Sequence, residues 1–281
     1  KSYFEKIFST KRMERYDRLY NDEKRAIAHY QCNIELAESF YPCLSILEVA
    51  LRNALSRELE TMTGREDWYA VFPTTPGLSN LNRYITKASK QIAGRHEIVT
   101  PSKIIAELTL GFWVSLLNAE YELLLWKHLR RAFPYMPKHL RQRKNVSSPL
   151  NSFRSFRNRV FHNESICWSM KRVTEIHNEL YQVMGWINKD LPTKLKHLDT
   201  ISKNLWWCWN QDAIELFKMV DEELWQLANG NPIAMLDMVD LKRYKELATD
   251  AAFLAKLEVV YRNFKKYMES KSKSNTPQIS Y

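Results

Sequence analysis

The 281-residue sequence is poor in glycine and in long apolar runs. It contains 6 glycines, which disfavours glycine-rich phosphate loops and turn-rich β architectures. No run of about 18 apolar residues occurs, so no membrane-spanning helix and no membrane partner are expected. The amino end is charged from its first residue and lacks an apolar signal core. We therefore expect a cytoplasmic protein.

Paired cysteines are missing as well. The chain has four cysteines, which stand far apart without a C-x-x-C pair: Cys32, Cys43, Cys167 and Cys208. Neither a zinc site nor a disulfide framework is expected from this spacing. Because each cysteine has apolar or aromatic neighbours, all four are predicted to be buried as small hydrophobic residues. No metal site and no cofactor are predicted.

Period-two segments with hairpin turns are also lacking, whereas helical periodicity is clear along the chain. From Phe40 to Leu59, apolar residues recur at steps of three and four, which predicts an amphipathic helix ending near Gly64. A separate helix is expected before it, starting at about Asp22. The predicted fold class is all-α, with antiparallel helices joined by short connections.

The remaining pattern divides the chain further. Proline, glycine and threonine predict a loop over residues 72–80, and Pro134, Pro137 and Pro149 are expected to interrupt the helices. The predicted helices cover residues 81–93, a long apolar segment from Pro101 to about 133, residues 149–162 and residues 168–186. The expected domains are a helical domain over 1–190, a smaller helical module over 191–270 and a polar tail over 271–281.

What the sequence has in excess is positive charge, with 42 Lys and Arg against 32 Asp and Glu. No acidic residue lies between Glu122 and Glu164. A solvated surface is one interpretation of this window, and a surface that binds RNA or another phosphate ligand is the other. Apart from Arg157, the cations proposed to bind RNA are Lys127, Arg130, Arg131, Lys138, Arg141, Arg143, Lys144, Arg154 and Arg159.

An Arg and a His lie near the end of this window in RNRVFH, where Arg157 precedes His162. Such a pair suits RNA cleavage, because His exchanges protons near neutral pH and Arg neutralises charge on phosphate. The spacing alone is weak evidence, since Arg172 and His177 repeat it, and we interpret that second match as a surface pair. A packed structural His is the alternative for His162. Ideal geometry places Arg157 about 140° from His162, so Arg157 must curl or the last turn must be distorted.

Three runs carry a family resemblance: NIELAESFYPCLSILEVALRNAL, KIIAELTLGFWVSLL and FRSFRNRVFHNESI. Together they resemble the Abi-like (abortive infection) proteins of the HEPN superfamily over residues 10–190. The resemblance implies a HEPN-like helical bundle, a metal-independent endoribonuclease active in phage defence, and a homodimer. It places Arg157 and His162 as the catalytic pair, with Asn158 as the polar residue after the Arg. Some members bind RNA without cleaving it, so an RNA-binding or toxin-regulating protein is the alternative.

The stretch from residue 191 to 281 resembles the amino-terminal helical region of bacterial alpha-glucan (glycogen) phosphorylases, notably in NLWWCWN. The resemblance implies a non-catalytic module of carbohydrate metabolism, because the pyridoxal-phosphate lysine and the sugar site belong to parts outside this region. Its expected partners are a glucan or a phosphorylase catalytic domain. Trp206, Trp207 and Trp209 are predicted to bind sugar rings or to form a core or docking surface.

Overall fold

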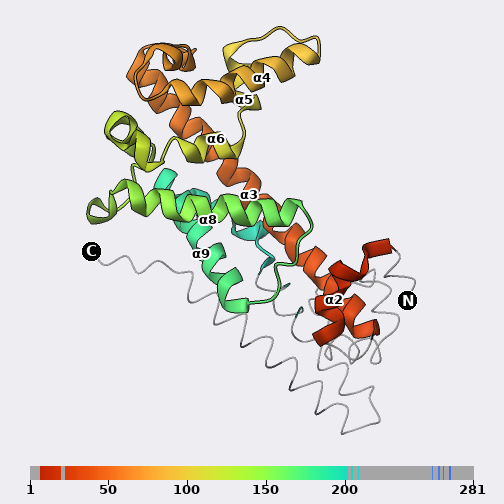
Figure 1. The fold of residues 1–281 in the computed structure, drawn as a ribbon. Helices are drawn as coiled ribbons and strands as arrows, with labels where there is room; N and C mark the ends of the chain where they lie inside the picture. Colours follow the sequence, from red (N-terminus) through yellow and green to blue (C-terminus); the bar gives the residue numbers. More distant parts are fainter. Residues whose placement is uncertain are drawn as a thin grey trace. The chain divides into compact units, whose positions relative to one another are not determined.

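A computed structural model describes residues 7–19 and 23–201 and, beyond them, the single positions 204, 208, 255, 259, 262 and 266. Every regular element in this part of the chain is a helix (Figure 1), so the predicted all-α class is confirmed there. The chain divides into two compact units. Unit 1 comprises residues 1–39, 165–170 and 200–281, and unit 2 comprises residues 40–164 and 171–199.

The longest helix, α3 (Glu23–Thr63), is continuous over 41 residues. The prediction of two helices here is wrong, because Pro42 lies inside α3. Proline has no N–H to donate to the preceding turn, so the helix lacks one hydrogen bond there. Two residues later Leu44 is fully buried, and this packing in the core offsets the lost bond. The predicted end at Gly64 is confirmed. Gly64 has a φ of 70°, which suits glycine, and its N–H donates to the carbonyl of Glu60 at 2.7 Å.

Unit 1 is tied together by buried polar contacts. Helix α2 (Thr10–Leu19) contributes the fully buried Tyr16. On α3, the side-chain oxygen of Asn33 accepts hydrogen bonds from the backbone N–H groups of Ile166 at 2.8 Å and Cys167 at 3.2 Å. Buried N–H groups need such partners. Asn33 therefore holds a segment that is distant in sequence against α3.

The core of unit 2 forms where α3 meets α8 (Arg143–Phe161). The rings of Phe40 on α3 and Phe156 on α8 contact each other edge to face, with centroids 4.7 Å apart. Each fully buried apolar side chain stabilises the fold by about 1.5–3 kcal/mol. The predicted stripe of α3 supplies much of this core, with exposures of 1% or less at Leu44, Leu47, Leu51, Leu55 and Leu59.

The rest of unit 2 consists of further helical elements, most of them short. Between α3 and α8 they are η1 (Trp68–Thr74), η2 (Ser79–Leu81), α4 (Asn82–Gly94), α5 (Pro101–Glu107), α6 (Leu110–Ser115), η3 (Ala119–Tyr121), η4 (Glu122–Trp126), α7 (Lys127–Leu129), η5 (Arg130–Ala132) and η6 (Lys138–Leu140). After α8 come α9 (Met170–Ile187), α10 (Leu191–Leu195) and η7 (Lys196–Leu198). The predicted helices over 81–93 and 168–186 correspond to α4 and α9, and η1 and η2 occupy part of the predicted loop.

The long apolar helix expected from Pro101 onward is wrong. Leu108 and Thr109 are extended, with ψ values of 124° and 160°, and they separate α5 from α6. The free carbonyl of Leu108 accepts a hydrogen bond from the indole N–H of Trp113 at 3.1 Å. This fold-back buries Trp113 to 1% exposure. A straight amphipathic helix buries only one face, so it could not bury apolar side chains on every face of this segment.

The expected helix boundary at Pro149 is also wrong. Pro149 lies inside α8, which already begins at Arg143. Val146 and Leu150 on either side of it are fully buried, and this packing offsets the lost backbone hydrogen bond. None of the helices in the described part of the chain combines the length and the apolar character that a membrane crossing requires.

Candidate functional site

Helix α8 ends at the predicted place, with His162 as its C-cap. Asn163 adopts the left-handed conformation, with a φ of 53°. The N–H groups of Asn163 and Glu164 donate to the carbonyls of Val160 at 3.1 Å and Arg159 at 2.9 Å. This pattern is a Schellman motif. It presents the side chain of His162 to solvent at the helix end, so the alternative of a packed structural His is wrong.

Arg157 curls over α8, which was one of the two possibilities left open by the spacing. Its guanidinium carbon lies 4.2 Å from the ring centroid of Phe161, within cation–π range. The last turn keeps its helical hydrogen bond, since the N–H of His162 donates to the carbonyl of Asn158 at 2.9 Å. The side chain of Asn158 is exposed. Within the described residues, no hydrogen bond joins Arg157 to His162.

A carboxylate on α3 faces this arginine. The Nε of Arg157 lies 3.6 Å from Oε2 of Glu48, with side-chain exposures of 32% and 28%. That distance exceeds a hydrogen bond, and the Nε has no hydrogen-bond partner within the described residues. An ion pair this accessible contributes about 0–1 kcal/mol. Because the Nε atom itself is buried, a phosphate could replace Glu48 there only if the Arg157 side chain moves.

Glu48 and Arg52 are spaced four residues apart on α3, as in an i,i+4 ion pair. In the structure, the Nε of Arg52 instead donates to the side-chain oxygen of Asn53 at 3.2 Å, and Glu48 faces Arg157. The packing of α3 against α8 thus brings Glu48 to the Arg157/His162 segment, where it meets Arg157. Chain proximity could not reveal this pairing, because the two residues are more than one hundred positions apart.

The second Arg–His match has a structural role. The interpretation as a surface pair is wrong, because His177 is 3% exposed and its Nε2 lies 2.8 Å from Oδ2 of Asp199. Arg172 instead pairs with Glu175 at 3.3 Å. Burial, with the negative charge of Asp199 as a second cause, raises the pKa of the nearby Cys43 thiol to about 12. His177 and Asp199 thus belong to the interior of unit 2, whereas Arg172 lies at its surface.

The four cysteines are all buried, as predicted. They are also free of disulfides. Trp113 belongs to the core, whereas Trp126 is half-buried. No group of three potential metal ligands occurs among the residues that the structure describes.

The cationic window falls into two structural groups. Arg130, Arg131 and Arg141 line a hollow of about 440 Å³ together with Pro134. The pKa of His128 is lowered, first by burial and then by the positive charges of Lys127 and Arg131. The local field is therefore positive.

Other cations of the window are already engaged in ion pairs or hydrogen bonds. Arg143 is held by Glu122 at 2.8 Å and by the carbonyl of Leu117 at 2.9 Å, and Arg159 pairs with Glu164 at 3.3 Å. Arg141 also donates to two backbone carbonyls. Arg143 thus has a mainly structural role, which the charge count could not reveal. Of the remaining members, Lys127, Lys138 and Lys144 are exposed and Arg154 is half-buried.

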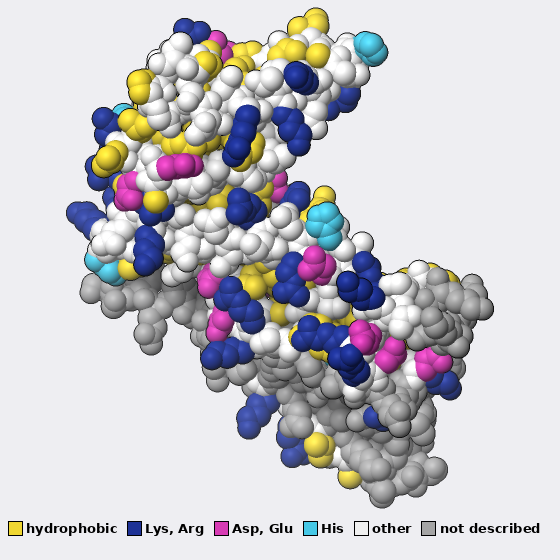
Figure 2. Space-filling view, viewed as in Figure 1, with side chains coloured by type: hydrophobic (Ala, Val, Ile, Leu, Met, Phe, Trp, Pro, Cys, Tyr) yellow, Lys and Arg dark blue, Asp and Glu magenta, His cyan; other side chains and the backbone are white. Residues whose placement is uncertain are grey.

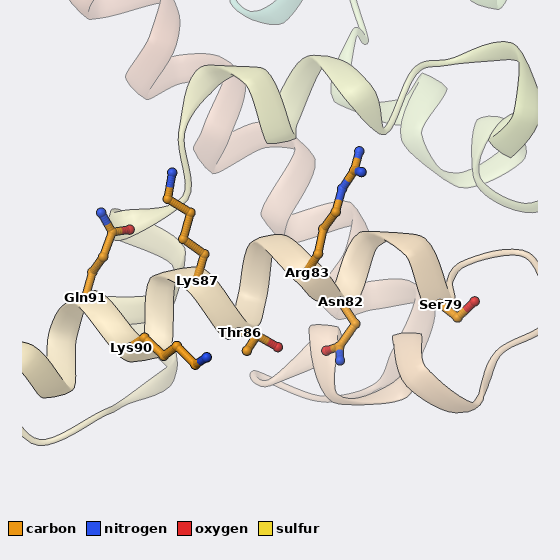
Figure 3. Close-up of a pocket in the computed structure, with 7 residues that line it drawn as sticks. All are labelled: Ser79, Asn82, Arg83, Thr86, Lys87, Lys90 and Gln91. Atoms are coloured by element: carbon orange, nitrogen blue, oxygen red, sulfur yellow. The ribbon is translucent and has the colours of Figure 1, made fainter.

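The structure adds a cationic surface that sequence reasoning missed. One face of α4 lines a pocket of about 600 Å³ with Arg83, Lys87 and Lys90 among polar side chains (Figure 3). The signal was present in the spacing of these cations, which is four and then three residues. Figure 2 shows Lys and Arg side chains over the part of the face where Figure 1 draws α4 and α5.

The comparisons with known proteins concern the last part of the chain. A family model described as "Protein of unknown function (DUF3417)" matches residues 191–281. Most of this segment, including Trp206, Trp207 and Trp209, lies outside the described residues. The role predicted for these tryptophans is therefore untested by the structure.

Curated relatives include phosphorylases. A glycogen phosphorylase of Mycobacterium tuberculosis is 35% identical over 82 residues, which is 29% of this chain and 10% of that enzyme. A maltodextrin phosphorylase of Thermococcus litoralis is 34% identical over 90 residues, covering 32% of this chain and 11% of the enzyme. A glycogen phosphorylase of Aquifex aeolicus is 38% identical over 73 residues, covering 26% and 10%. The chain spans about a tenth of the length of these relatives, and no solved structure matches it.

Proposed function

We propose that residues 191–281 act as a non-catalytic module related to alpha-glucan phosphorylases. The match of this segment to DUF3417 and the similarity to phosphorylases support the proposal. Because the similarity covers about a tenth of each enzyme, we assign glucan binding, or docking to a phosphorylase catalytic domain, rather than phosphorolysis. Trp206 and Trp207 would supply the flat apolar faces on which sugar rings stack.

Glycogen co-sedimentation tests this module in the full chain. We expect the wild type to sediment with glycogen and a Trp206→Ala/Trp207→Ala variant to bind roughly tenfold more weakly, because two stacking faces of about 0.5–1.5 kcal/mol each are lost. A Trp206→Phe/Trp207→Phe variant keeps the aromatic faces and should retain most of the binding. Absence of sedimentation by the wild type would remove glucan binding from the proposal.

The geometry of unit 2 favours a second function for the other part of the chain. We propose that it is an Abi-like HEPN domain that cleaves RNA without a metal. The observation that carries the proposal is an exposed His162 at the end of α8, about one turn beyond a half-buried Arg157 that is held by a long ion pair with Glu48. The hollow lined by Arg130, Arg131 and Arg141 supports a polyanionic substrate.

The proposed chemistry uses the RNA's own 2′-hydroxyl as nucleophile. The 2′-oxygen bonds to the adjacent phosphorus and its proton passes to a base, while the P–O5′ bond breaks and the 5′-oxygen takes up a proton. His162 performs one of these transfers, and Arg157 neutralises the phosphate charge that develops between them. The products are a 2′,3′-cyclic phosphate and a 5′-hydroxyl. A homodimer would supply a second His162 for the other proton transfer.

Cleavage in the presence of EDTA tests the second function. We expect wild-type protein to shorten RNA in EDTA at the same rate as in magnesium, because no step requires a metal. Strongly salt-dependent binding of RNA without product would instead support an RNA-binding or toxin-regulating protein. A protein that neither binds nor cleaves RNA would contradict both versions of the RNA proposal.

A further inference from the structure

One face of helix α4 forms a cationic pocket that lies outside the 122–164 window. Its volume is about 600 Å³, and its lining is Ser79, Asn82, Arg83, Thr86, Lys87, Lys90 and Gln91. We infer that this pocket binds consecutive phosphates of an RNA strand. The inference rests on the proposed action of unit 2 on RNA, and it assigns a second contact region to the same substrate.

The helix separates a buried face from this polar face. Ile85, Ala88 and Ile92 are at most 6% exposed and anchor α4 in the core. In Figure 3 the polar side chains point away from α4 in two directions, with Arg83 and Lys87 toward one edge of the polar face and Lys90 toward the other. From Arg83 to Lys90 the helix rises about 10 Å. The cations are thus spread along the pocket, as successive charges on a strand require.

These cations lack acidic partners. Within the described residues, no carboxylate lies within ion-pair distance of Arg83, Lys87 or Lys90. The acids that follow α4 are already engaged. Glu97 pairs with Arg95 at 2.9 Å and with Lys103 at 2.8 Å, and Glu107 pairs with Arg95 at 2.7 Å.

The shape of the pocket favours a strand over a small anion. Sites for small molecules usually enclose 70–90% of the ligand surface. Here all lining residues come from α4 and the turn just before it, Ser79 included, so a ligand would keep one side in water. A nucleic-acid backbone binds in this way, with its phosphates on the protein and its bases outside.

The lining predicts binding that is independent of base sequence. It contains hydroxyl, amide and cationic groups and no aromatic ring. Such groups contact phosphate oxygens, whereas single-stranded bases are bound by aromatic stacking. The pocket would therefore position the RNA while the chemistry takes place at His162.

A salt titration of RNA binding tests the pocket. The probe is a fluorescent single strand of 2′-O-methyl RNA, which the proposed chemistry cannot cleave, and the readout is anisotropy with the full chain. The variant is Lys87→Gln/Lys90→Gln, and the control is Lys171→Gln/Lys189→Gln, which removes the same charge from exposed positions outside the pocket. Thermal melts of both variants establish that the fold is retained.

We expect the slope of log affinity against log salt to fall by about 1.4 for the pocket variant, which is two contacts at about 0.7 each. The affinity should fall roughly 25-fold near 0.1 M salt and little near 1 M. The loss should be the same for probes of different sequence. The control variant should keep the wild-type slope.

Three outcomes overturn the inference, and they are distinguishable. Equal affinity and slope in the pocket and control variants would remove RNA from the pocket while leaving the RNA function of unit 2 intact. A pocket variant that no longer binds inorganic tripolyphosphate but still binds RNA as the wild type does would assign the pocket to a small polyphosphate. A wild type that does not bind the probe would overturn the proposed RNA function itself, and the inference with it.

Discussion

Replacing His162 with alanine is expected to lower the rate of RNA cleavage by roughly 10²–10⁴-fold, which is the usual contribution of a general acid or base. The side chain is exposed at the C-cap of α8, so its removal should leave the fold and RNA binding nearly unchanged. Arg157→Ala should lower cleavage by roughly 10²–10³-fold, because the charge of the pentacovalent phosphate is no longer neutralised. The measurement is single-turnover cleavage of a labelled RNA in EDTA.

The chain offers matched controls for both changes. His139 is an exposed histidine inside the cationic window, and Arg172 is a surface arginine paired with Glu175. Alanine at either position should leave the cleavage rate within about twofold of the wild type, because surface changes away from the site are nearly neutral. Undiminished cleavage in both the His162 and the Arg157 variants would contradict the proposed site.

Replacing Trp113 with alanine is expected to lower the free energy of unfolding of unit 2 by about 3–5 kcal/mol, as for other buried tryptophans. Trp113 is 1% exposed and packs edge to face against Phe112 and Trp68, with ring centroids 5.1 and 5.8 Å away. The substitution removes these contacts and leaves the buried carbonyl of Leu108 without its indole donor. Urea denaturation followed by circular dichroism measures the change.

Trp113→Phe separates the two contributions. It keeps an aromatic ring in the core and loses the hydrogen bond to Leu108, so we expect a smaller loss of about 1–3 kcal/mol. A loss below about 1 kcal/mol for Trp113→Ala would show that the fold-back between α5 and α6 does not carry the core of unit 2.

The parts of the fold that sequence predicts are those decided by local chemistry. The leucine stripe of α3 has a helical period, and Gly64 and Asn163 end their helices because both adopt positive φ readily. The all-α class follows from the same periodicity. The continuity of α3 through Pro42 and the break after Leu108 are decided by tertiary packing, which outweighs local preference.

In the candidate site, too, local sequence sets some features and tertiary contacts set the others. Arg157/His162 and Arg172/His177 have identical spacing, yet His162 is exposed and His177 is buried against Asp199. The difference depends on a residue 22 positions beyond His177. Likewise, Glu48 reaches Arg157 only because α3 and α8 pack together. Spacing identifies candidates, and tertiary contacts decide between them.

Charge counting located one cationic surface and missed another. The 122–164 window stood out because it holds no acid, although Arg143 and Arg159 prove to be paired. The cations of α4 were hidden in the count by nearby acids such as Glu97. That acid is engaged with Arg95 and Lys103. A linear count cannot separate paired from unpaired charges.

The measurement that tests the proposed RNA function most directly is the identity of the 3′ end that unit 2 leaves on RNA. Full-length protein is incubated with a labelled RNA in EDTA, and the product ends are analysed before and after treatment with a phosphatase and with acid. The account predicts a 2′,3′-cyclic phosphate that forms with the wild type and disappears with His162→Ala. A 3′-hydroxyl product, or a cyclic product that persists in the His162→Ala variant, would contradict it.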